Sequence, residues 1–233
     1  MMLTRVGLQK TTLLDFPGQV AATVFTPGCN LRCPYCHNPL LLHPPYPEDL
    51  ISLDELDRFL AKRAKVLGGV CISGGEPLLH ENLDELLGII HRHGLKVKLD
   101  TNGTFPERLA RAQVEYIAMD LKTVPEKYEI LLGAVSSGQI STAAKIRSSI
   151  KYLQSATIPY EIRTTVVPGI IGAAELREIL PLLQGAERYV LTPFRQAETL
   201  DPAYATLHAP GDDELNTLCE LATQAGVACE VRT

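Results

Sequence analysis

The sequence predicts an α/β protein that folds as a partial (β/α)6 TIM-like barrel, open on one side, with a single domain over residues 1–233. One observation is that strand-like runs alternate with helical ones, which favours a parallel sheet with right-handed crossovers. A second is that the chain is shorter than the roughly 250 residues of a closed eight-unit barrel. A third is that no stretch rich in Gly, Ser or Pro divides the chain.

Each predicted element has a local signal. Apolar or β-branched runs indicate strands at Val20–Thr26, Gly69–Ser73, Lys96–Asp100, Glu115–Asp120, Tyr160–Val167 and Arg188–Pro193. Helical periodicity follows them at Leu53–Val66, Leu83–His93, Pro106–Arg111, Thr142–Ser155, Ala174–Leu183 and Asp213–Ala225, and a short last strand is expected at Val227–Val231. The capping box of Ser52 and Glu55 and the glycine stops at Gly94 and Gly226 support these boundaries independently.

Composition excludes several classes of protein. The formal net charge is −5, with acidic and basic residues interspersed, so we expect neither a nucleic-acid partner nor a membrane partner. The segment Met1–Lys10 lacks the apolar core of a signal peptide, and no apolar run reaches about 18 residues. We therefore expect a cytoplasmic protein, in which the six cysteines serve as ligands, catalysts or buried thiols rather than disulfides.

Polar residues follow the predicted strands where each strand ends. In parallel α/β proteins the chemistry gathers at the carboxyl ends of the strands, so these residues are the candidate site. In chain order they are Cys29, Cys33 and Cys36; Gly74-Gly75-Glu76-Pro77; Asp100-Thr101-Asn102-Gly103; Asp120-Leu121-Lys122; Arg163 and Pro168-Gly169; and Pro193-Phe194-Arg195.

The three clustered cysteines are the sharpest signal. Three thiolates can hold three corners of a four-iron cluster and leave the fourth iron open to another ligand. Structural zinc is an alternative, with His37 as a fourth ligand. Cys33-Pro34-Tyr35-Cys36-His37 also matches the c-type haem attachment pattern, although no export signal accompanies it. The last alternative is a set of buried thiols, which this density in a Pro/Asn-rich loop disfavours.

The motif Cys29-x-x-x-Cys33-x-x-Cys36, with the aromatic Tyr35 and the later Gly74-Gly75-Glu76-Pro77 segment, resembles the radical S-adenosylmethionine (radical SAM) superfamily. Three flanking segments resemble the activating proteins of glycyl radical enzymes: Leu14–Gly18, Phe25–Asn30 and Cys36–Pro39. Among those, the sequence is most similar to the activating proteins of anaerobic ribonucleoside-triphosphate reductase. The pyruvate formate-lyase activating enzyme is a more distant relative.

This resemblance implies a [4Fe-4S] cluster on Cys29, Cys33 and Cys36, reduced by flavodoxin or ferredoxin. It implies cleavage of S-adenosylmethionine to a 5′-deoxyadenosyl radical that takes hydrogen from a glycine of a partner enzyme, here the anaerobic ribonucleotide reductase. The residues expected to bind the cofactor are Tyr35, His37, Gly74, Gly75, Glu76, Asp100, Asn102, Asp120, Lys122, Arg163 and Arg195. Arg195 departs from the pyruvate formate-lyase activator pattern, which has a histidine at this position.

The resemblance also suggests a monovalent cation held by Asp100, Thr101 and Asp120. Two carboxylates at neighbouring strand ends would repel one another unless a cation or ammonium lay between them.

Two other functions stay open. One is a radical SAM enzyme that acts on a small molecule, similar to the deazaguanine synthases. The other is a zinc-stabilised binding module without catalysis. We expect Cys71, Cys219 and Cys229 to be buried thiols and His91 and His93 to be surface residues.

Overall fold

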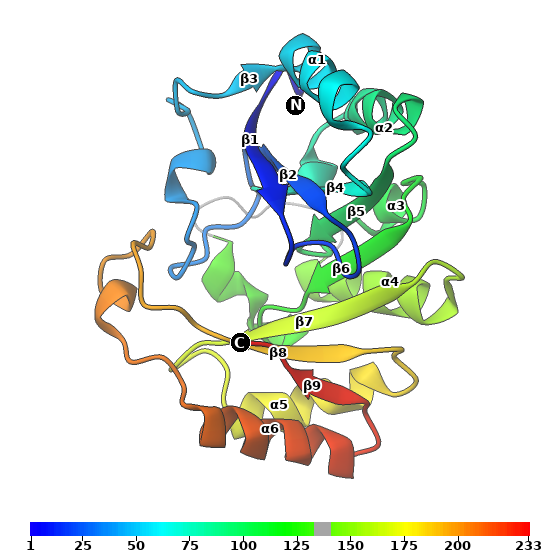
Figure 1. Cartoon of the computed structure of the whole chain (residues 1–233). Coiled ribbons are helices and arrows are strands. Elements are labelled where there is room, and N and C mark those ends of the chain that lie inside the picture. The colour runs from blue at the N-terminus through cyan, green and yellow to red at the C-terminus, as the bar shows by residue number, and fades with distance from the viewer. Residues whose placement is uncertain (133–140) are drawn as a thin grey trace. The chain divides into compact units, whose positions relative to one another are not determined.

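The computed structural model describes residues 1–132 and 141–233 (Figure 1). By their contacts these residues group into two compact units. The first consists of Met1–Asn30, Leu40–Thr101 and Glu107–Ile117, and the second of Leu31–Pro39, Asn102–Pro106 and Ala118–Thr233. The strand β6 (Tyr116–Asp120) contributes residues to both units.

The first unit contains a run of five neighbouring strands. Their order is β3 (Ile51–Ser52), β1 (Arg5–Thr12), β2 (Ala21–Thr26), β4 (Gly69–Gly74) and β5 (Lys96–Thr101). The strands β2, β4 and β5 pair in parallel, whereas β1 pairs antiparallel with both β2 and β3. The helices of this unit are α1 (Leu53–Arg63) and α2 (Leu83–Arg92), with a 3-10 turn η2 at Pro77–Leu79.

The second unit contains the parallel strands β7 (Tyr160–Val166), β8 (Tyr189–Pro193) and β9 (Cys229–Val231). Its helices are α4 (Thr142–Ser155), α5 (Ala173–Ile179) and α6 (Asp212–Gln224), with 3-10 turns η3 (Pro125–Leu131), η4 (Leu180–Leu183) and η5 (Tyr204–Thr206). Two short elements, η1 (Pro39–Leu41) and α3 (Pro106–Leu109), lie at boundaries between the units.

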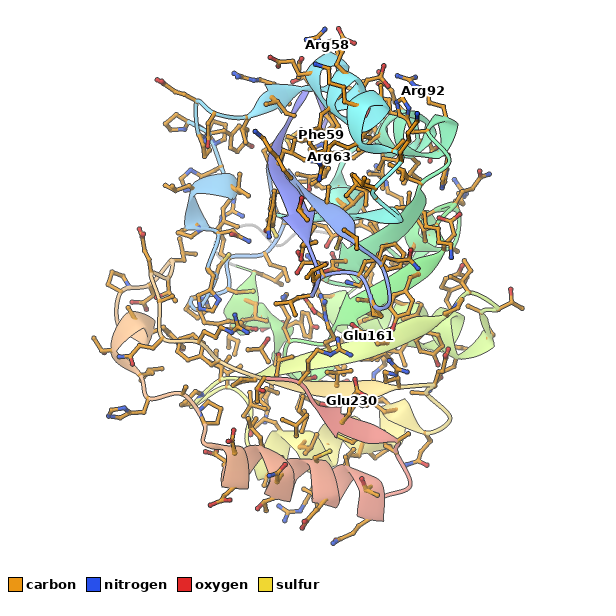
Figure 2. All side chains as sticks on the ribbon, in the orientation of Figure 1. Arg58, Phe59, Arg63, Arg92, Glu161 and Glu230 are labelled. Atoms are coloured by element: carbon orange, nitrogen blue, oxygen red, sulfur yellow. The ribbon has the colours of Figure 1, made fainter. Side chains whose placement is uncertain are left out.

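Each unit has its own apolar core. Most residues of the parallel strands β2, β4, β5, β7 and β8 are buried, as expected of strands covered on both faces, whereas no residue of β9 is fully buried. In the first unit Val70 and Ile72 of β4 and Leu56 and Leu60 of α1 are fully buried. The exposed side of these helices is charged: Arg58 is exposed, and Arg92 pairs with Asp57 at 2.8 Å (Figure 2).

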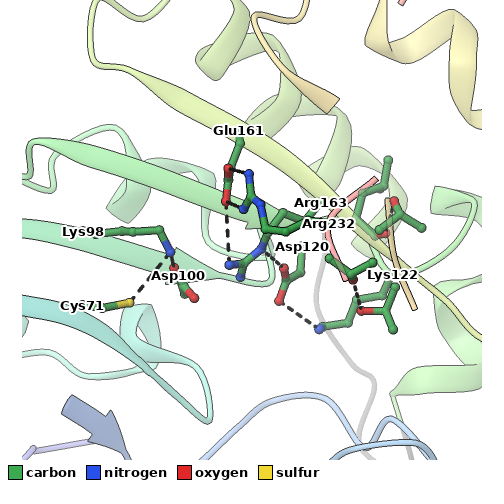
Figure 3. A network of polar contacts seen from close by, with 12 residues as sticks. Cys71, Lys98, Asp100, Asp120, Lys122, Glu161, Arg163 and Arg232 are labelled. Atoms are coloured by element: carbon green, nitrogen blue, oxygen red, sulfur yellow. Dashed lines mark hydrogen bonds and ion pairs between the residues drawn. The ribbon is translucent and has the colours of Figure 1, made fainter. Parts of the chain in front are cut away.

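A buried charge ties the C-terminal strand of the second unit to its centre. Glu161 of β7 has no exposed surface, and the guanidinium of Arg232 donates to its two carboxylate oxygens at 2.9 and 2.8 Å (Figure 3). Arg232 also donates to Glu230 at 2.6 Å. Burying a carboxylate costs free energy unless it is paired, and this two-point contact with an arginine pairs it.

The prediction of an α/β fold with a mostly parallel, open sheet is confirmed. The single domain over the whole chain stays a prediction. The antiparallel strand β1 was not predicted, and α5 ends earlier than expected because Pro181 lacks an amide hydrogen and turns the chain into η4. No helix among the described residues is long and apolar enough to cross a bilayer.

Candidate functional site

In the first unit, the turn after β4 is bonded to the end of β2. The amide of Gly75 donates to the carbonyl of Thr26 at 2.8 Å, and the amide of Glu76 donates to the carbonyl of Gly28 at 2.9 Å. Gly28 directly precedes Cys29, which is partly exposed. The predicted Gly-Gly-Glu segment and the first cysteine are therefore brought together by backbone hydrogen bonds.

The two glycines of this turn are required by that close approach. Gly74 has φ of +112°, and a Cβ atom there would lie 2.4 Å from the amide nitrogen of Thr26. A Cβ atom on Gly75 would lie 1.9 Å from the carbonyl oxygen of Gly28. The structure thus gives the glycines a packing role, and their predicted approach to a ligand stays a prediction.

Glu76 is fully buried, and its carboxylate has two hydrogen-bond donors. The Oε1 atom accepts from the amide of Leu78 at 3.0 Å and from the hydroxyl of Thr101 at 2.8 Å. The first bond caps η2 and the second reaches the end of β5. Glu76 and Thr101, predicted from two separate strand ends, therefore lie in direct contact.

Asp100, also at the end of β5, pairs with a residue that the sequence analysis did not select. The ammonium of Lys98 contacts Oδ1 of Asp100 and lies 3.8 Å from Sγ of Cys71 in β4 (Figure 3). Lys98 is almost completely buried. Its position two residues before Asp100, on the same face of the strand, was the available sequence signal.

His80 is a second residue that sequence reasoning missed. Its Nε2 atom lies 2.8 Å from the carbonyl oxygen of Pro27, in the loop between β2 and Cys29. A carbonyl oxygen only accepts, so Nε2 carries the hydrogen. Burial lowers the pKa of His80 below its usual value, so the neutral ring is favoured.

Cys33 and Cys36, the other two cysteines of the motif, belong to the second unit. They lie in a turn that is hydrogen-bonded to the segment after β8. The amide of Cys36 donates to the carbonyl of Cys33 at 3.0 Å. The amides of Leu200 and Asp201 donate to the carbonyls of Cys36 and Pro34 at 3.1 and 2.8 Å. This two-point attachment was not predicted, since nothing in the composition of residues 196–201 marks it.

Cys33 and Tyr35 form the buried part of this turn. Burial raises the pKa of the Cys33 thiol to about 11, although the Lys122 ammonium opposes this rise by favouring a thiolate. Burial also raises the pKa of Tyr35 well above its usual value. The Tyr35 hydroxyl is buried and has no hydrogen-bond partner within the described residues. A buried hydroxyl of this kind is costly unless a ligand or water satisfies it.

Asp120 at the end of β6, Lys122 just after it and Arg163 in the middle of β7 form one charged group (Figure 3). The carboxylate of Asp120 accepts from Nε of Arg163 at 2.8 Å and from Nζ of Lys122 at 3.4 Å. Burial opposes ionisation of Asp120, but these two cations hold its pKa at about 2, well below its usual value. Arg163 therefore lies against the Asp120 carboxylate, and its contact with the cofactor stays a prediction.

His37 and Arg195 are linked through the backbone. Nε2 of His37 lies 2.8 Å from the carbonyl oxygen of Arg195, and the imidazole stacks on the ring of Phe194 at 5.5 Å. The residue Arg195 itself is exposed. Zinc binding through His37 would have to use Nδ1, because Nε2 donates to this carbonyl.

Asn102 is buried, and its side chain serves the turn after β5. Its Oδ1 atom accepts from the amide of Thr104 at 3.0 Å and from the Thr104 hydroxyl at 2.6 Å. This contact stabilises the local backbone, so the cofactor contact that was expected of Asn102 stays a prediction.

The donor set fits an iron–sulfur cluster. Cys29, Cys33 and Cys36 are free thiols, and cysteine thiolates are the usual ligands of iron–sulfur clusters. Tyr35, in the same turn as Cys33 and Cys36, has a buried hydroxyl without a hydrogen-bond partner among the described residues. Within residues 1–132 and 141–233, no three Cys, His, Asp or Glu side chains form a ready-made metal site.

Comparison with known proteins places this site in a family. Residues 23–179, more than half of the chain, match the model of the Radical SAM superfamily. The chain belongs to this superfamily, whose members use a [4Fe-4S] cluster and S-adenosylmethionine. It is therefore an enzyme.

Two curated relatives cover most of the chain. A putative glycyl-radical enzyme activating enzyme of Methanocaldococcus jannaschii is 28% identical over 223 residues, which cover 93% of this chain and 90% of the relative. A pyruvate formate-lyase-activating enzyme of Staphylococcus aureus is 28% identical over 225 residues, with 86% and 87% covered.

Solved structures support the fold. SuiB of Streptococcus suis, for which a structure with bound S-adenosylmethionine is also known, aligns with a TM-score of 0.64 at 16% identity. The alignment covers 91% of this chain but 48% of SuiB, so the chain spans about half the length of that protein. QueE of Escherichia coli aligns over 99% of this chain and 93% of its own, with a TM-score of 0.55 and 15% identity.

Proposed function

We propose that this protein activates a glycyl radical enzyme, with anaerobic ribonucleoside-triphosphate reductase as its partner. In this proposal Cys29, Cys33 and Cys36 hold a [4Fe-4S] cluster, and flavodoxin or ferredoxin supplies the electron. The enzyme would act in the cytoplasm, where these small electron carriers are found. The observation that carries the proposal is the three-cysteine set in a chain whose activating-enzyme relatives match it over most of its length.

When bound, the cluster and S-adenosylmethionine supply the radical chemistry: an electron cleaves the cofactor to methionine and a 5′-deoxyadenosyl radical, which takes hydrogen from a glycine of the partner. The protein's task is to bind, orient and exclude water. Three thiolates leave one iron of the cluster without a protein ligand, which is the place for the cofactor's amino and carboxylate groups.

Lys122 and Tyr35 are the groups best suited to an anionic part of the cofactor. The Lys122 ammonium keeps its charge, because its nearby anion Asp120 raises its pKa well above the usual value despite the opposing effect of burial. Asp120 is itself already held by Arg163. The unsatisfied Tyr35 hydroxyl could donate to the same ligand. The proposal leaves a monovalent cation out, since Asp100 and Asp120 each have a basic partner.

The decisive experiment mixes the two proteins. The chain is purified without oxygen, loaded with iron and sulfide, reduced, and incubated with S-adenosylmethionine and the candidate reductase. We expect 5′-deoxyadenosine by chromatography and a glycyl radical doublet by electron paramagnetic resonance. A partner variant with alanine at its radical glycine should give no doublet. The Cys33→Ala variant should give neither product, whereas Cys219→Ala should give both.

The same experiment separates the alternatives. If 5′-deoxyadenosine forms but no candidate glycyl radical enzyme gains a radical, the partner assignment is wrong, and an enzyme that acts on a small molecule becomes the better explanation. A colourless protein that binds zinc and no iron would contradict radical chemistry altogether. The fold likeness to QueE does not decide between the two enzyme functions, because it concerns architecture alone.

A further inference from the structure

The pair formed by Lys98 and Asp100 bears on how this enzyme balances charge at the end of β5. The expected monovalent cation rested on two carboxylates, Asp100 and Asp120, that need a positive charge nearby. The structure gives each carboxylate its own basic partner. The question is whether Lys98 does at Asp100 what a metal cation would otherwise do.

The position of Lys98 makes it an unusual lysine. It lies inside β5, opposite Cys71 in the parallel ladder with β4, and its side chain is 2% exposed. Lysine is rarely buried to this extent unless it is paired. Its ammonium contacts the carboxylate of Asp100 and the Sγ atom of Cys71, the latter at 3.8 Å (Figure 3).

The strand geometry fixes this contact. Residues two apart in a strand point to the same face, so Lys98 and Asp100 share a face of β5. The long side chain of Lys98 therefore brings its ammonium group to the Asp100 carboxylate from within the sheet. A metal cation at the same oxygen would have to approach this ammonium closely, and two like charges repel strongly where water is scarce.

The neighbouring Thr101 also has a hydrogen-bond partner. Its hydroxyl donates to the buried carboxylate of Glu76 at 2.8 Å. Of the three residues expected to bind a cation, Asp100 thus pairs with Lys98, Thr101 bonds Glu76, and Asp120 pairs with Arg163 and Lys122.

We propose that the Lys98 ammonium takes the place of a monovalent metal cation at Asp100, so that this enzyme binds S-adenosylmethionine without needing potassium or sodium. The inference rests on the proposed function only in naming S-adenosylmethionine as the ligand. Lys98 is a positioning residue: it holds the charge and orientation of Asp100 and does not touch the reacting atoms.

The test measures binding of S-adenosylmethionine to the cluster-loaded protein, without a turnover assay. Affinity and the thermal midpoint are compared in potassium chloride, sodium chloride and tetramethylammonium chloride at equal ionic strength, since tetramethylammonium is too bulky to enter a metal site. For the unaltered protein we expect affinities equal within about twofold in all three salts. A loss of about tenfold or more in tetramethylammonium would overturn the inference, because it would show that a metal cation is needed.

The Lys98→Met variant provides the second arm. It keeps the apolar stem and removes the charge, so we expect weak binding in tetramethylammonium that potassium or sodium restores by about tenfold. Binding that is equally weak in every salt would show a purely structural role, and binding as tight as in the unaltered protein would show no role; both contradict the proposal. Lys96→Met is the matched control, because Lys96 is exposed at the start of the same strand and should change nothing.

These outcomes are separable from failure of the proposed function. If the protein assembles no cluster or binds no S-adenosylmethionine in any salt, the proposed function fails. If binding occurs but depends on potassium or sodium, only the role of Lys98 fails. Should Lys98→Met not fold, the salt series on the unaltered protein still decides: independence of the metal cation supports the inference, and dependence overturns it.

Discussion

His37 and Arg195 are joined by a hydrogen bond of 2.8 Å from the imidazole Nε2 to the backbone carbonyl, and the same ring stacks on Phe194. The contact ties the residue after Cys36 to the segment that follows β8. The two residues were predicted separately as cofactor contacts. Their direct link shows that at least part of the role of His37 is to hold the cysteine turn in place.

Replacing His37 by Ala should loosen this turn. The change removes a hydrogen bond and a ring contact, together worth about 1–2 kcal/mol. We expect a lower thermal midpoint and less iron retained per chain after gel filtration. His43→Ala is the control, because His43 is exposed. Equal iron retention in the two variants would argue against a bracing role for His37.

The cluster ligands can be separated from the other thiols. Replacing Cys29, Cys33 or Cys36 by Ala should abolish cluster-dependent formation of 5′-deoxyadenosine, because three thiolates are the minimum set that holds the cluster. Cys219→Ala should leave product formation nearly unchanged. Absorption near about 400 nm and iron content report cluster assembly. A similar loss in Cys219→Ala would overturn the ligand assignment.

Gly75 tests how tightly the Gly-Gly-Glu turn packs. A Cβ atom there would meet the carbonyl oxygen of Gly28 at 1.9 Å, so the backbone must move. Gly75→Ala should destabilise the fold by about 3 kcal/mol or more in urea unfolding. Gly88→Ala is matched to it, because nothing lies within 4 Å of that position in α2, and it should stabilise the helix by about 0.5–1 kcal/mol. Similar effects of both changes would contradict the packing argument.

The Glu76→Gln variant tests whether the buried carboxylate of Glu76 contributes to binding of S-adenosylmethionine. In Glu76→Gln one oxygen becomes an NH2 group, which in place of Oε1 can accept from neither the Leu78 amide nor the Thr101 hydroxyl. We expect affinity for S-adenosylmethionine to fall about tenfold while iron incorporation stays near normal. Glu81→Gln, at an exposed carboxylate five residues later, is the control. Unchanged affinity would remove Glu76 from the binding site.

His80 predicts how stability depends on pH. Its pKa is lowered in the folded protein, whereas an unfolded histidine titrates near about 6.5. The unfolded state therefore binds more protons below about pH 6.5, and stability falls as the pH drops through this range. In His80→Gln this part of the fall should vanish, which urea midpoints between about pH 5 and 7.5 would reveal. An unchanged slope would show that other groups cause the pH dependence.

The sequence predicts strands correctly where an apolar run is followed by polar residues. The parallel strands β2, β4 and β7 could be predicted because apolar runs end in polar residues. The strand β1 was missed because Arg5–Thr12 alternates few apolar with several polar residues and is largely exposed. Its pairing with β2 is a tertiary contact that no local signal encodes.

The site was predictable in its residue types but not in its contacts. The cysteines and the carboxylates stand at strand ends, which a pattern reveals. The partners of those groups come from distant positions: Lys98 lies inside a strand and looks like a surface lysine in sequence, and Asp201 holds the cysteine turn through its backbone amide. Backbone hydrogen bonds depend on where the chain passes, so side-chain identity does not reveal them.

The contact of Glu161 with Arg232 limits how this family of sequences can diverge. A fully buried carboxylate that loses this guanidinium loses its two-point contact, so substitution at either position alone is penalised. In an alignment of orthologues the two positions should covary, with Glu–Arg exchanged as a pair for two apolar residues. Arg232, which directly follows β9, would then vary together with a residue of β7 that lies 71 positions earlier in the chain.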